Sequence, residues 1–484
     1  MFGITRKPSG LVRPMLAGIL AWALGGCSSV HPWINQPLSA NAVATPTAVV
    51  PPATQVSSND SDPQALDSSI IGVVALSGGG ARAAAFGLGV LRELKATRFE
   101  WQGRETSLLD EVDLVSGVSG GSVLAAYYAA FGDQVFERFD HDFLHTNFQS
   151  NLIHDLLSPT QLYRLGSPWY GRSNALAQRL DELYEHRSFG DLSKTRGHPE
   201  LLITATDLTT GAPFEFTAEQ FNLICSDLSS VPLSFAVAAS SSVPLLLSPV
   251  TIRNYAGQCP ANQGTDASAL QDDNLSAHLI RMIAKSYRNA EARPYLHLVD
   301  GGIVDNLGVR GLLNRTIARG SLNERFRGLP PGSIHQLVLV SVDSEKDAAE
   351  HIDDTDRIPS NLQVLDSLVF GAGSRLTQET TAMVEDASRR MAQELQADRL
   401  IPDSPFARDA EIHVIHVSLK NLRNAELRQR LVNVPTALTI LPIQVDELQE
   451  AGRTALRESP EFQHLRQSLH AHSDQDAKTA IPEQ

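Results

Sequence analysis

A serine within a G-x-S-x-G pattern is the residue of this sequence whose surroundings most directly suggest a chemical reaction. The pattern Gly117-Val118-Ser119-Gly120-Gly121 follows the apolar run 112–115 and precedes an apolar stretch at 122–130. These runs predict a strand and a helix, and a serine on the tight turn between them exposes its hydroxyl for nucleophilic attack. Ser119 is therefore the candidate nucleophile.

A glycine-rich turn lies one strand–helix unit earlier. The run SGGGAR at 77–82 joins the β-branched run 70–76 to an apolar stretch that predicts a helix through Lys95. Such a turn aims backbone N–H groups at an anion. It formally fits the dinucleotide pattern G-x-G-x-x-G/A. The serine motif after the next strand favours an oxyanion hole instead, in which these groups stabilise a developing alkoxide.

A serine nucleophile needs a base, and the sequence offers a carboxylate. Asp300 ends the predicted strand 295–299, which places it at the carboxyl edge of a sheet, where open α/β sheets build their sites. Considered alone, Asp-Gly is also a common turn dipeptide. The alternative is a Ser-Asp-His triad, whose histidine would follow Asp300 in the chain. The available residues are His335, His351, His413, His416 and His464.

Together and in this order, the three motifs resemble the patatin-like phospholipase family, whose pattern is G-G-G-x-R, G-x-S-x-G and D-G-[AG]. Two further stretches, TATDLTTG at 204–211 and ASSSVP at 239–244, are similar to other blocks of that family. The resemblance implies an α/β fold of three layers (α/β/α) with a mostly parallel central sheet and a nucleophile elbow. It implies lipid-ester hydrolysis through a Ser-Asp dyad and an acyl-enzyme. The residues carried over are Ser119 and Asp300 as the catalytic pair, Gly78, Gly79, Gly80 and Arg82 at the oxyanion hole, and the motif glycines Gly117, Gly121, Gly301 and Gly302.

The charge balance bears on the partners of the protein. There are 40 Lys and Arg against 55 Asp and Glu, which gives a net charge of −15. Nucleic-acid binding requires a basic face, so this partner class is not expected. No calcium or zinc ligand cluster stands out in the sequence, and we expect turnover without a metal or other cofactor. The expected partner is a lipid or ester substrate.

The sequence of the N-terminal segment predicts a targeting signal rather than part of the folded domain. Residues 1–26 combine three basic residues with a 12-residue apolar stretch, too short to span a bilayer, and so predict a signal peptide. Its end, Leu24-Gly25-Gly26-Cys27, resembles a bacterial lipobox, which implies acylation of Cys27. An incidental cysteine near an ordinary cleavage site is the alternative. Ser28, by resemblance to the enterobacterial sorting rule, suggests an outer-membrane lipoprotein facing the periplasm.

The remaining chain divides into three predicted parts. Residues 27–68 are rich in Pro, Ala, Thr and Ser and predict a flexible tether. Residues 69–345 hold the motifs and predict the catalytic domain. Residues 346–484 continue the α/β alternation and predict an extension packed on that domain. Cys225 and Cys259 either form a disulfide or remain two thiols, since sequence contains no distances.

The segment after the predicted nucleophile helix is unusually aromatic. Residues 127–170 contain ten aromatic side chains, which predict either an acyl-chain pocket or lid, or a helical layer packed on the sheet. The expected function is a lipid-anchored acyl hydrolase of the phospholipase A or lysophospholipase type. A broad carboxylesterase or an acyltransferase would use the same residues. A non-catalytic envelope lipoprotein on a hydrolase fold is the alternative from another class.

Overall fold

The computed structural model describes residues 28–39 and 69–479, except 193, 195–198, 260–273, 319, 327, 347–355, 361–363, 365–366 and 368–371. The predicted signal peptide, Cys27 and most of the predicted tether therefore lie outside the described residues. Within the described part of the chain, no helix combines the length and apolar character that crossing a bilayer requires.

One sheet forms the centre of the molecule. Its strands are β1 (Ile70–Leu76), β4 (Val112–Val118), β5 (Glu200–Asp207), β6 (Pro213–Glu215), β7 (Val250–Arg253), β8 (Tyr295–Val299), β9 (Ile334–Asp343) and β10 (Phe406–Ser418). The order is β10-β9-β1-β4-β5-β8-β7, with β6 on β5, and the first five strands run parallel. The others are antiparallel. β2 (Arg98–Trp101) and β3 (Arg104–Ser107) form a separate hairpin.

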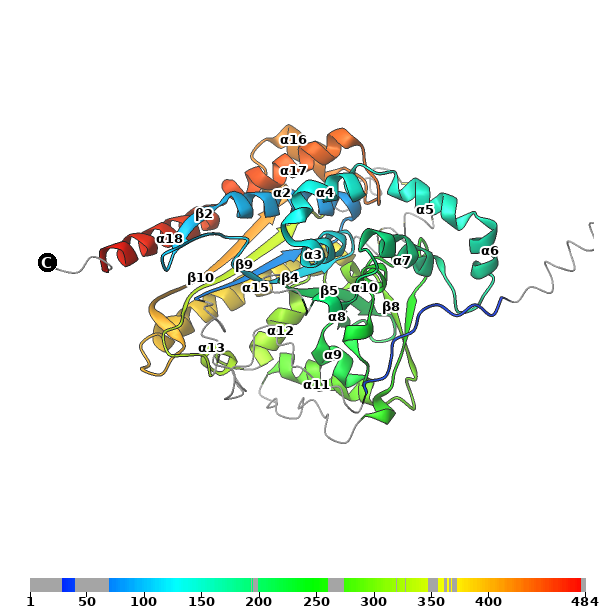
Figure 1. Cartoon of the computed structure of the whole chain (residues 1–484), viewed down its shortest axis with the longest axis horizontal. Helices are drawn as coiled ribbons and strands as arrows, with labels where there is room; N and C mark the ends of the chain where they lie inside the picture. The colour runs from blue at the N-terminus through cyan, green and yellow to red at the C-terminus, as the bar shows by residue number, and fades with distance from the viewer. Residues whose placement is uncertain are drawn as a thin grey trace, which may run out of the picture.

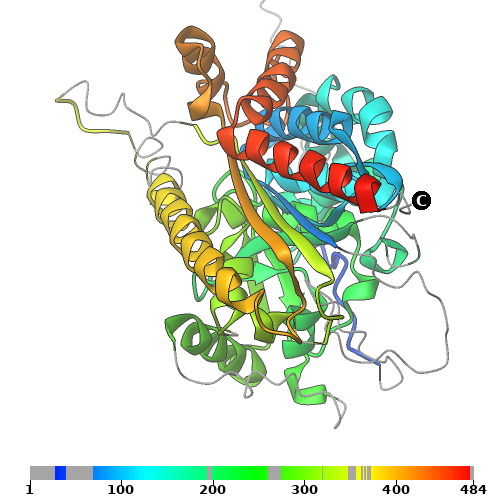
Figure 2. The ribbon, with the colours of Figure 1, turned by 90° about the vertical axis from the view of Figure 1, so that its left-hand side faces the viewer.

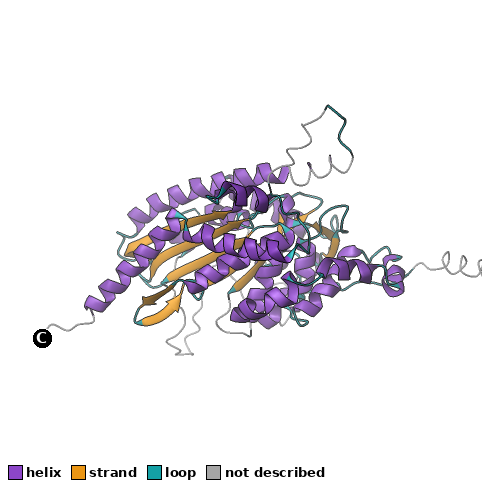
Figure 3. Cartoon of the chain, turned by 90° about the horizontal axis from the view of Figure 1, so that it is seen from above, coloured by secondary structure: helices purple, strands orange, loops and turns teal. Residues whose placement is uncertain are grey.

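Helices cover both faces of the sheet, as buried parallel strands require (Figures 1, 2 and 3). Side chains of β9 alternate accordingly: Val338 and Val340 join the larger core beneath α2 and α17, and Leu339 packs toward α12 and α15. The predicted three-layer fold is confirmed. The helices are α2 (Gly80–Ala96), α3 (Gly120–Phe131), α4 (Val135–Phe139), α5 (Phe148–Leu156), α6 (Pro159–Leu165), α7 (Arg172–Leu183), α8 (Phe189–Leu192), α9 (Ala218–Leu223), α10 (Leu233–Ser240), α11 (Leu275–Arg288), α12 (Arg310–Ala318), α13 (Leu322–Arg325), α15 (Ala372–Asp398), α16 (Ala425–Val432), α17 (Pro442–Arg457) and α18 (Pro460–Thr479).

The C-terminal residues extend this sheet rather than forming a separate unit. β10 pairs with β9 along most of its length, and α17 packs on α2. This packing is close because both helices present glycines. A β-carbon on Gly89 would lie 2.0 Å from the carbonyl oxygen of Gln449, and one on Gly452 would lie 2.2 Å from that of Phe86.

Residues 28–39, here called the strap, correct the prediction of a flexible tether from residue 27. The Asn35 side chain donates to Ser226 Oγ at 2.8 Å and accepts from the Arg253 N–H at 2.7 Å. Trp33 packs on Phe235 with 4.5 Å between ring centroids. Composition missed this docking because these contacts join residues about two hundred positions apart.

A disulfide lies beside the strap. Cys225 and Cys259 are bonded, with their Cα atoms 5.4 Å apart. The carbonyl oxygen of Cys225 accepts a hydrogen bond from the Leu38 N–H at 2.8 Å. The disulfide therefore braces the segment on which the strap lies.

The aromatic segment 127–170 divides into two parts. From Tyr127 to Phe148 most of its aromatic side chains are buried in the main core, as a helical layer requires. On α5, on α6 and in the turn that follows α6, large apolar side chains are instead exposed, among them Tyr163 and Trp169. The helical-layer interpretation therefore holds for residues 127–148, and the acyl-chain pocket or lid stays a prediction for the rest of the segment.

Candidate active site

Ser119 lies on a strained turn between β4 and α3. Its backbone has φ 48° and ψ −121°, a conformation that residues other than glycine rarely adopt. A β-carbon on Gly117 would lie 2.6 Å from Cα of Ser122, and one on Gly121 would lie 2.4 Å from the carbonyl oxygen of Leu76. Only glycine permits this close approach, so the turn has the geometry of a nucleophile elbow.

The structure brings Ser119 and Asp300 together. The Ser119 hydroxyl donates to Oδ2 of Asp300 at 2.8 Å, and Oδ1 accepts from the Gly302 N–H at 2.8 Å. The Asp300 N–H donates to the Ser242 carbonyl at 3.0 Å, and the Thr206 hydroxyl donates to the Asp300 carbonyl at 2.8 Å. Both members of the pair are buried. The carboxylate is thus held against the hydroxyl from several sides.

Burial changes the acidity of this carboxyl group. Loss of solvation raises the pKa of Asp300 to about 6, although hydrogen bonds from Gly302 and Ser119 act in the opposite direction. The group is therefore ionised at neutral pH and is a stronger base than an exposed aspartate. No histidine of the described residues hydrogen-bonds to Ser119 or Asp300. This arrangement does not favour the Ser-Asp-His alternative.

The strand that carries Asp300 to the site, β8, runs antiparallel to its neighbour β5. Only the last two residues of β8, Leu298 and Val299, pair with that strand. β8 therefore approaches from beyond the carboxyl edge of β5 and ends there. Across β5, Thr204 pairs with Val118, the residue before the nucleophile. The sequence predicted Asp300 at the end of a strand, where the structure has it, but carried no prediction of the direction of that strand.

The glycine turn lies directly beside the elbow. A β-carbon on Gly78 would lie 3.4 Å from Cβ of Ser119, and one on Gly120 would lie 2.4 Å from the backbone nitrogen of Gly80. The N–H groups of Gly79 and Gly80 have no acceptor among the described residues. Gly79 and Gly80 have φ of 141° and 63°. Two backbone donors are therefore free near the nucleophile.

Gly78 differs from the other two predicted donors. Its N–H donates to the Asn306 carbonyl at 3.1 Å, so this group is already used in the structure. A β-carbon at Gly78 would lie 2.5 Å from Oδ1 of Asn306. Gly78 thus serves the close packing of the turn.

Arg82 is buried behind the glycine turn. Its guanidinium donates to the carbonyl oxygens of Ser344 at 2.9 Å and Val434 at 2.5 Å. Burial lowers its pKa to about 10, which leaves it charged at neutral pH. The neighbouring Ala81 N–H donates to the Ala437 carbonyl at 2.7 Å. These contacts hold the turn between the end of β9 and residues 434–437.

Sequence reasoning missed several residues that position the site. Ser240 accepts from the Ser119 N–H at 2.8 Å and donates to the Thr204 carbonyl at 2.6 Å. It lies in the run ASSSVP, which drew attention only as a family block. Asn306 and Ala437 contribute through their main-chain carbonyls, for which a sequence contains no signal.

Two groups of described residues have the composition of a metal site. They are His335, Asp409 and His472, and Glu411, His413 and His464. Within the first group, Asp409 is hydrogen-bonded to His335 at 2.9 Å and lies 3.0 Å from His472. Both groups surround the amino-terminal halves of β9 and β10, whereas Ser119 follows the carboxyl end of β4. Neither group is placed to act on a carbonyl bound at Ser119.

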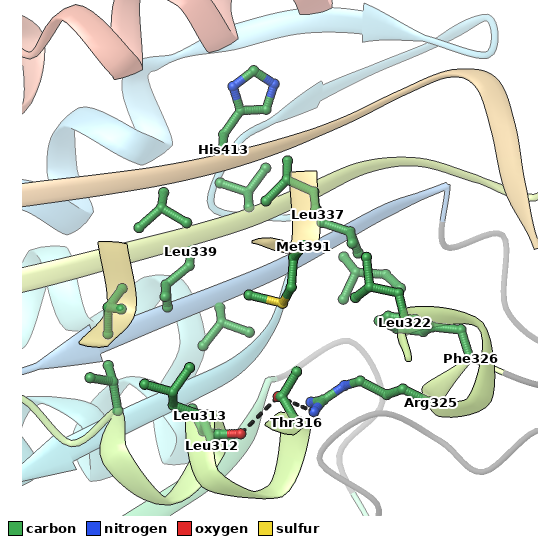
Figure 4. A pocket seen from close by; sticks show the side chains of 17 residues that line it. Leu312, Leu313, Thr316, Leu322, Arg325, Phe326, Leu337, Leu339, Met391 and His413 are labelled. Carbon is green, nitrogen blue, oxygen red and sulfur yellow. Dashed lines mark hydrogen bonds between the residues drawn. The ribbon is translucent and has the colours of Figure 1, made fainter. Parts of the chain in front are cut away.

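An apolar cavity of about 140 Å³ lies on the far side of the sheet (Figure 4). Leu337 and Leu339 of β9, Leu313 of α12 and Met391 of α15 contribute to its wall, with Arg325 near one end. Neither member of the Ser-Asp pair lines it. The cavity is a gap in the packing of the second helical layer, separate from the candidate active site.

Comparison with solved structures finds human GIVD cytosolic phospholipase A2 at 13% identity and TM-score 0.43, covering 84% of this chain and 61% of that one. It also finds VipD from Legionella pneumophila at 12% identity and TM-score 0.31, covering 84% of this chain and 67% of that one. This chain thus spans about three fifths of the length of the human enzyme. No curated protein matches it. Residues 74–313 match the family model of patatin-like phospholipases. The chain therefore contains a patatin-like phospholipase domain.

Proposed function

We propose that the protein is a serine acyl hydrolase in which Ser119 is the nucleophile and Asp300 is the general base. The observation that carries the proposal is the 2.8 Å hydrogen bond between the two side chains, with Ser119 on a strained elbow. A nucleophile and base within direct hydrogen-bond reach are the requirement for covalent catalysis of this kind.

The reaction has two halves. Asp300 accepts the hydroxyl proton while Ser119 Oγ adds to the ester carbonyl carbon, and collapse of the tetrahedral intermediate releases the alcohol, which takes the proton. Water then adds to the acyl-enzyme with Asp300 again accepting a proton. The bond between the acyl carbon and Ser119 Oγ breaks, Oγ takes the proton back from Asp300, and the carboxylic acid leaves. A carboxylate is a weak base for an alcohol, but a pKa near 6 reduces the mismatch.

The glycine turn supplies the electrostatic part of the mechanism. In each half the carbonyl oxygen gains negative charge, and the unengaged N–H groups of Gly79 and Gly80, in the turn beside the elbow, are the proposed donors. Removing one oxyanion donor typically costs about 3–4 kcal/mol in the barrier. Arg82 and Asn306 are positioning residues, because they hold the backbone that carries these donors.

The proposed substrates are carboxylic esters of lipids, of the phospholipase A or lysophospholipase type. The patatin-like domain supports a lipid-ester substrate. We further propose that acylation of Cys27 anchors the enzyme to the outer membrane, facing the periplasm. The lipobox-like end of residues 1–26 supports this anchor.

The test compares Ser119→Ala with Ser122→Ala. Ser122 is the matched control, because its hydroxyl belongs to the same turn and donates to the Ser119 carbonyl at 2.5 Å. We expect Ser119→Ala to abolish hydrolysis of nitrophenyl esters and of phosphatidylcholine, and Ser122→Ala to retain most of it. A chain-length series of nitrophenyl esters then defines the acyl preference. Turnover that survives in Ser119→Ala would contradict the proposal.

A further inference from the structure

Exposed apolar side chains gather on α5, on α6 and in the turn after α6. Ile153, Leu157, Leu162, Tyr163 and Trp169 are between 49% and 67% exposed, although the earlier half of the same aromatic segment is packed in the core. Scattered exposed leucines need no explanation, whereas several large apolar residues on neighbouring segments indicate an interaction surface. We call these five residues the α5–α6 surface.

The strap joins this surface. His31 stacks on Trp169 with 4.1 Å between ring centroids, and the Ser167 hydroxyl donates to the Val30 carbonyl at 2.7 Å. Figure 1 shows the dark-blue strap on the same side of the molecule as α6. Ser28, the first described residue of the strap, is buried and lies three residues before His31 in the chain.

The α5–α6 surface is also connected to the candidate active site. Residues 243–248 begin directly after Ser242, whose carbonyl holds the Asp300 N–H. Within this loop Leu245 and Leu246 are 64% and 65% exposed, and Arg172, two residues after Tyr170, donates to the Leu245 carbonyl at 2.7 Å. One loop thus spans from the dyad to the neighbourhood of Trp169.

Charge and residue type indicate what this surface binds. Residues 148–170 contain just two charged side chains, Asp155 and Arg164, in a chain of net charge −15. Such a surface gains by burying apolar area and has little attraction for anionic headgroups. Tyr163 and Trp169 are of the types that collect at the boundary between headgroups and acyl chains.

We propose that the α5–α6 surface docks on a phospholipid bilayer, with the strap lying beside it and the 243–248 loop directed toward the lipid. This inference rests on the proposed function for its anchor and its substrate. It adds an orientation: the body of the enzyme lies on the membrane instead of standing off on a free tether, and lipid reaches Ser119 along the docked side.

The first test uses the full lipoprotein on vesicles of brominated phosphatidylcholine, which quenches tryptophans that enter the acyl region. We expect the vesicles to quench the wild-type fluorescence and Trp169→Phe to lose most of that quenching. This readout does not depend on turnover. Equal quenching in the two proteins, or none in either, would overturn the docking.

The second test compares two substrates in one variant. Leu157→Ser, Leu162→Ser and Tyr163→Ser together are expected to lower hydrolysis of phosphatidylcholine vesicles by about tenfold, while hydrolysis of a soluble short-chain nitrophenyl ester is unchanged. The matched control is Leu400→Ser with Ile401→Ser, two residues 74% and 49% exposed after α15. If the triple variant kept the wild-type ratio of the two rates, the docking would be overturned. If the wild-type enzyme itself hydrolysed neither substrate, the proposed function would be contradicted instead.

Discussion

Ser119 and Asp300 are 8% and 6% exposed, whereas Leu162 and Tyr163 on α6 are 54% and 59% exposed. At the carboxyl edge of the sheet, glycines let backbones touch, and the carboxylate has a partner for each oxygen. On the α5–α6 surface the residues are large and apolar, and about half or more of each side chain is exposed. Catalysis requires the atoms of the first region to stay in place to within fractions of an ångström, whereas the second region needs only to present apolar surface area. The two regions should therefore respond to mutation in opposite ways.

The largest effect is expected from Asp300→Asn. The amide cannot accept the serine proton, so ester turnover should fall by at least about a thousandfold. Stability should not fall. The pKa of Asp300 is raised in the folded state, so its ionised form destabilises the fold as pH rises through about 6, and the amide removes this cost. Ester kinetics and thermal unfolding at neutral pH measure the two outcomes.

Asp305→Asn is the matched control for this change. Asp305 is also buried with a pKa raised to about 6, but both of its oxygens accept from backbone N–H groups, those of Gly308 and Arg310, at 3.0 and 2.9 Å. An amide nitrogen cannot accept either bond, whereas at position 300 it can donate to the Ser119 hydroxyl. We expect it to lower stability and to retain most of the activity. In wild type, kcat/KM should rise with pH through an apparent pKa of about 6. A profile that is flat from pH 5 to 8 would remove Asp300 from the role of base.

Gly80→Ala tests the precision required of the glycine turn. Gly80 has φ 63°, and a β-carbon there would lie 2.3 Å from the Ala437 carbonyl oxygen. We expect activity to fall by about a hundredfold as the N–H donors move, together with a loss of about 1–3 kcal/mol of stability. Gly103→Ala separates the two causes, because Gly103 has φ 75° and open space around it. If Gly103→Ala lost as much activity as Gly80→Ala, the loss could not be attributed to the contact between residue 80 and Ala437.

The smallest effect on catalysis is expected from removing the disulfide. Cys225→Ser with Cys259→Ser opens a loop with a sequence separation of 34 and should lower the free energy of unfolding by about 3 kcal/mol. Hydrolysis of soluble esters should be unchanged, since neither cysteine contacts the dyad. Urea unfolding measures the first quantity. Two thiols that alkylate without prior reduction would contradict the pairing.

The location of the catalytic motifs could be predicted because they depend on local structure. A strand, a glycine and a helix in sequence determine a turn, and the elbow around Ser119 and the turn at 77–82 are of this kind. The antiparallel direction of β8 could not be read in this way, because a five-residue apolar strand has the same pattern in either direction. Nor could the docking of residues 28–39, whose composition resembles that of a linker.

By itself the sequence predicted the candidate chemistry: a serine on an elbow, a carboxylate at the end of a strand, and a glycine-rich turn whose N–H groups could stabilise an oxyanion. The tertiary structure alone decided which groups meet. It brought Asp300 to 2.8 Å from Ser119, used the N–H of Gly78 elsewhere, and placed Ala437 against Gly80 and His31 against Trp169. These contacts join distant residues through main-chain atoms and exposed surface, for which residue type carries almost no information.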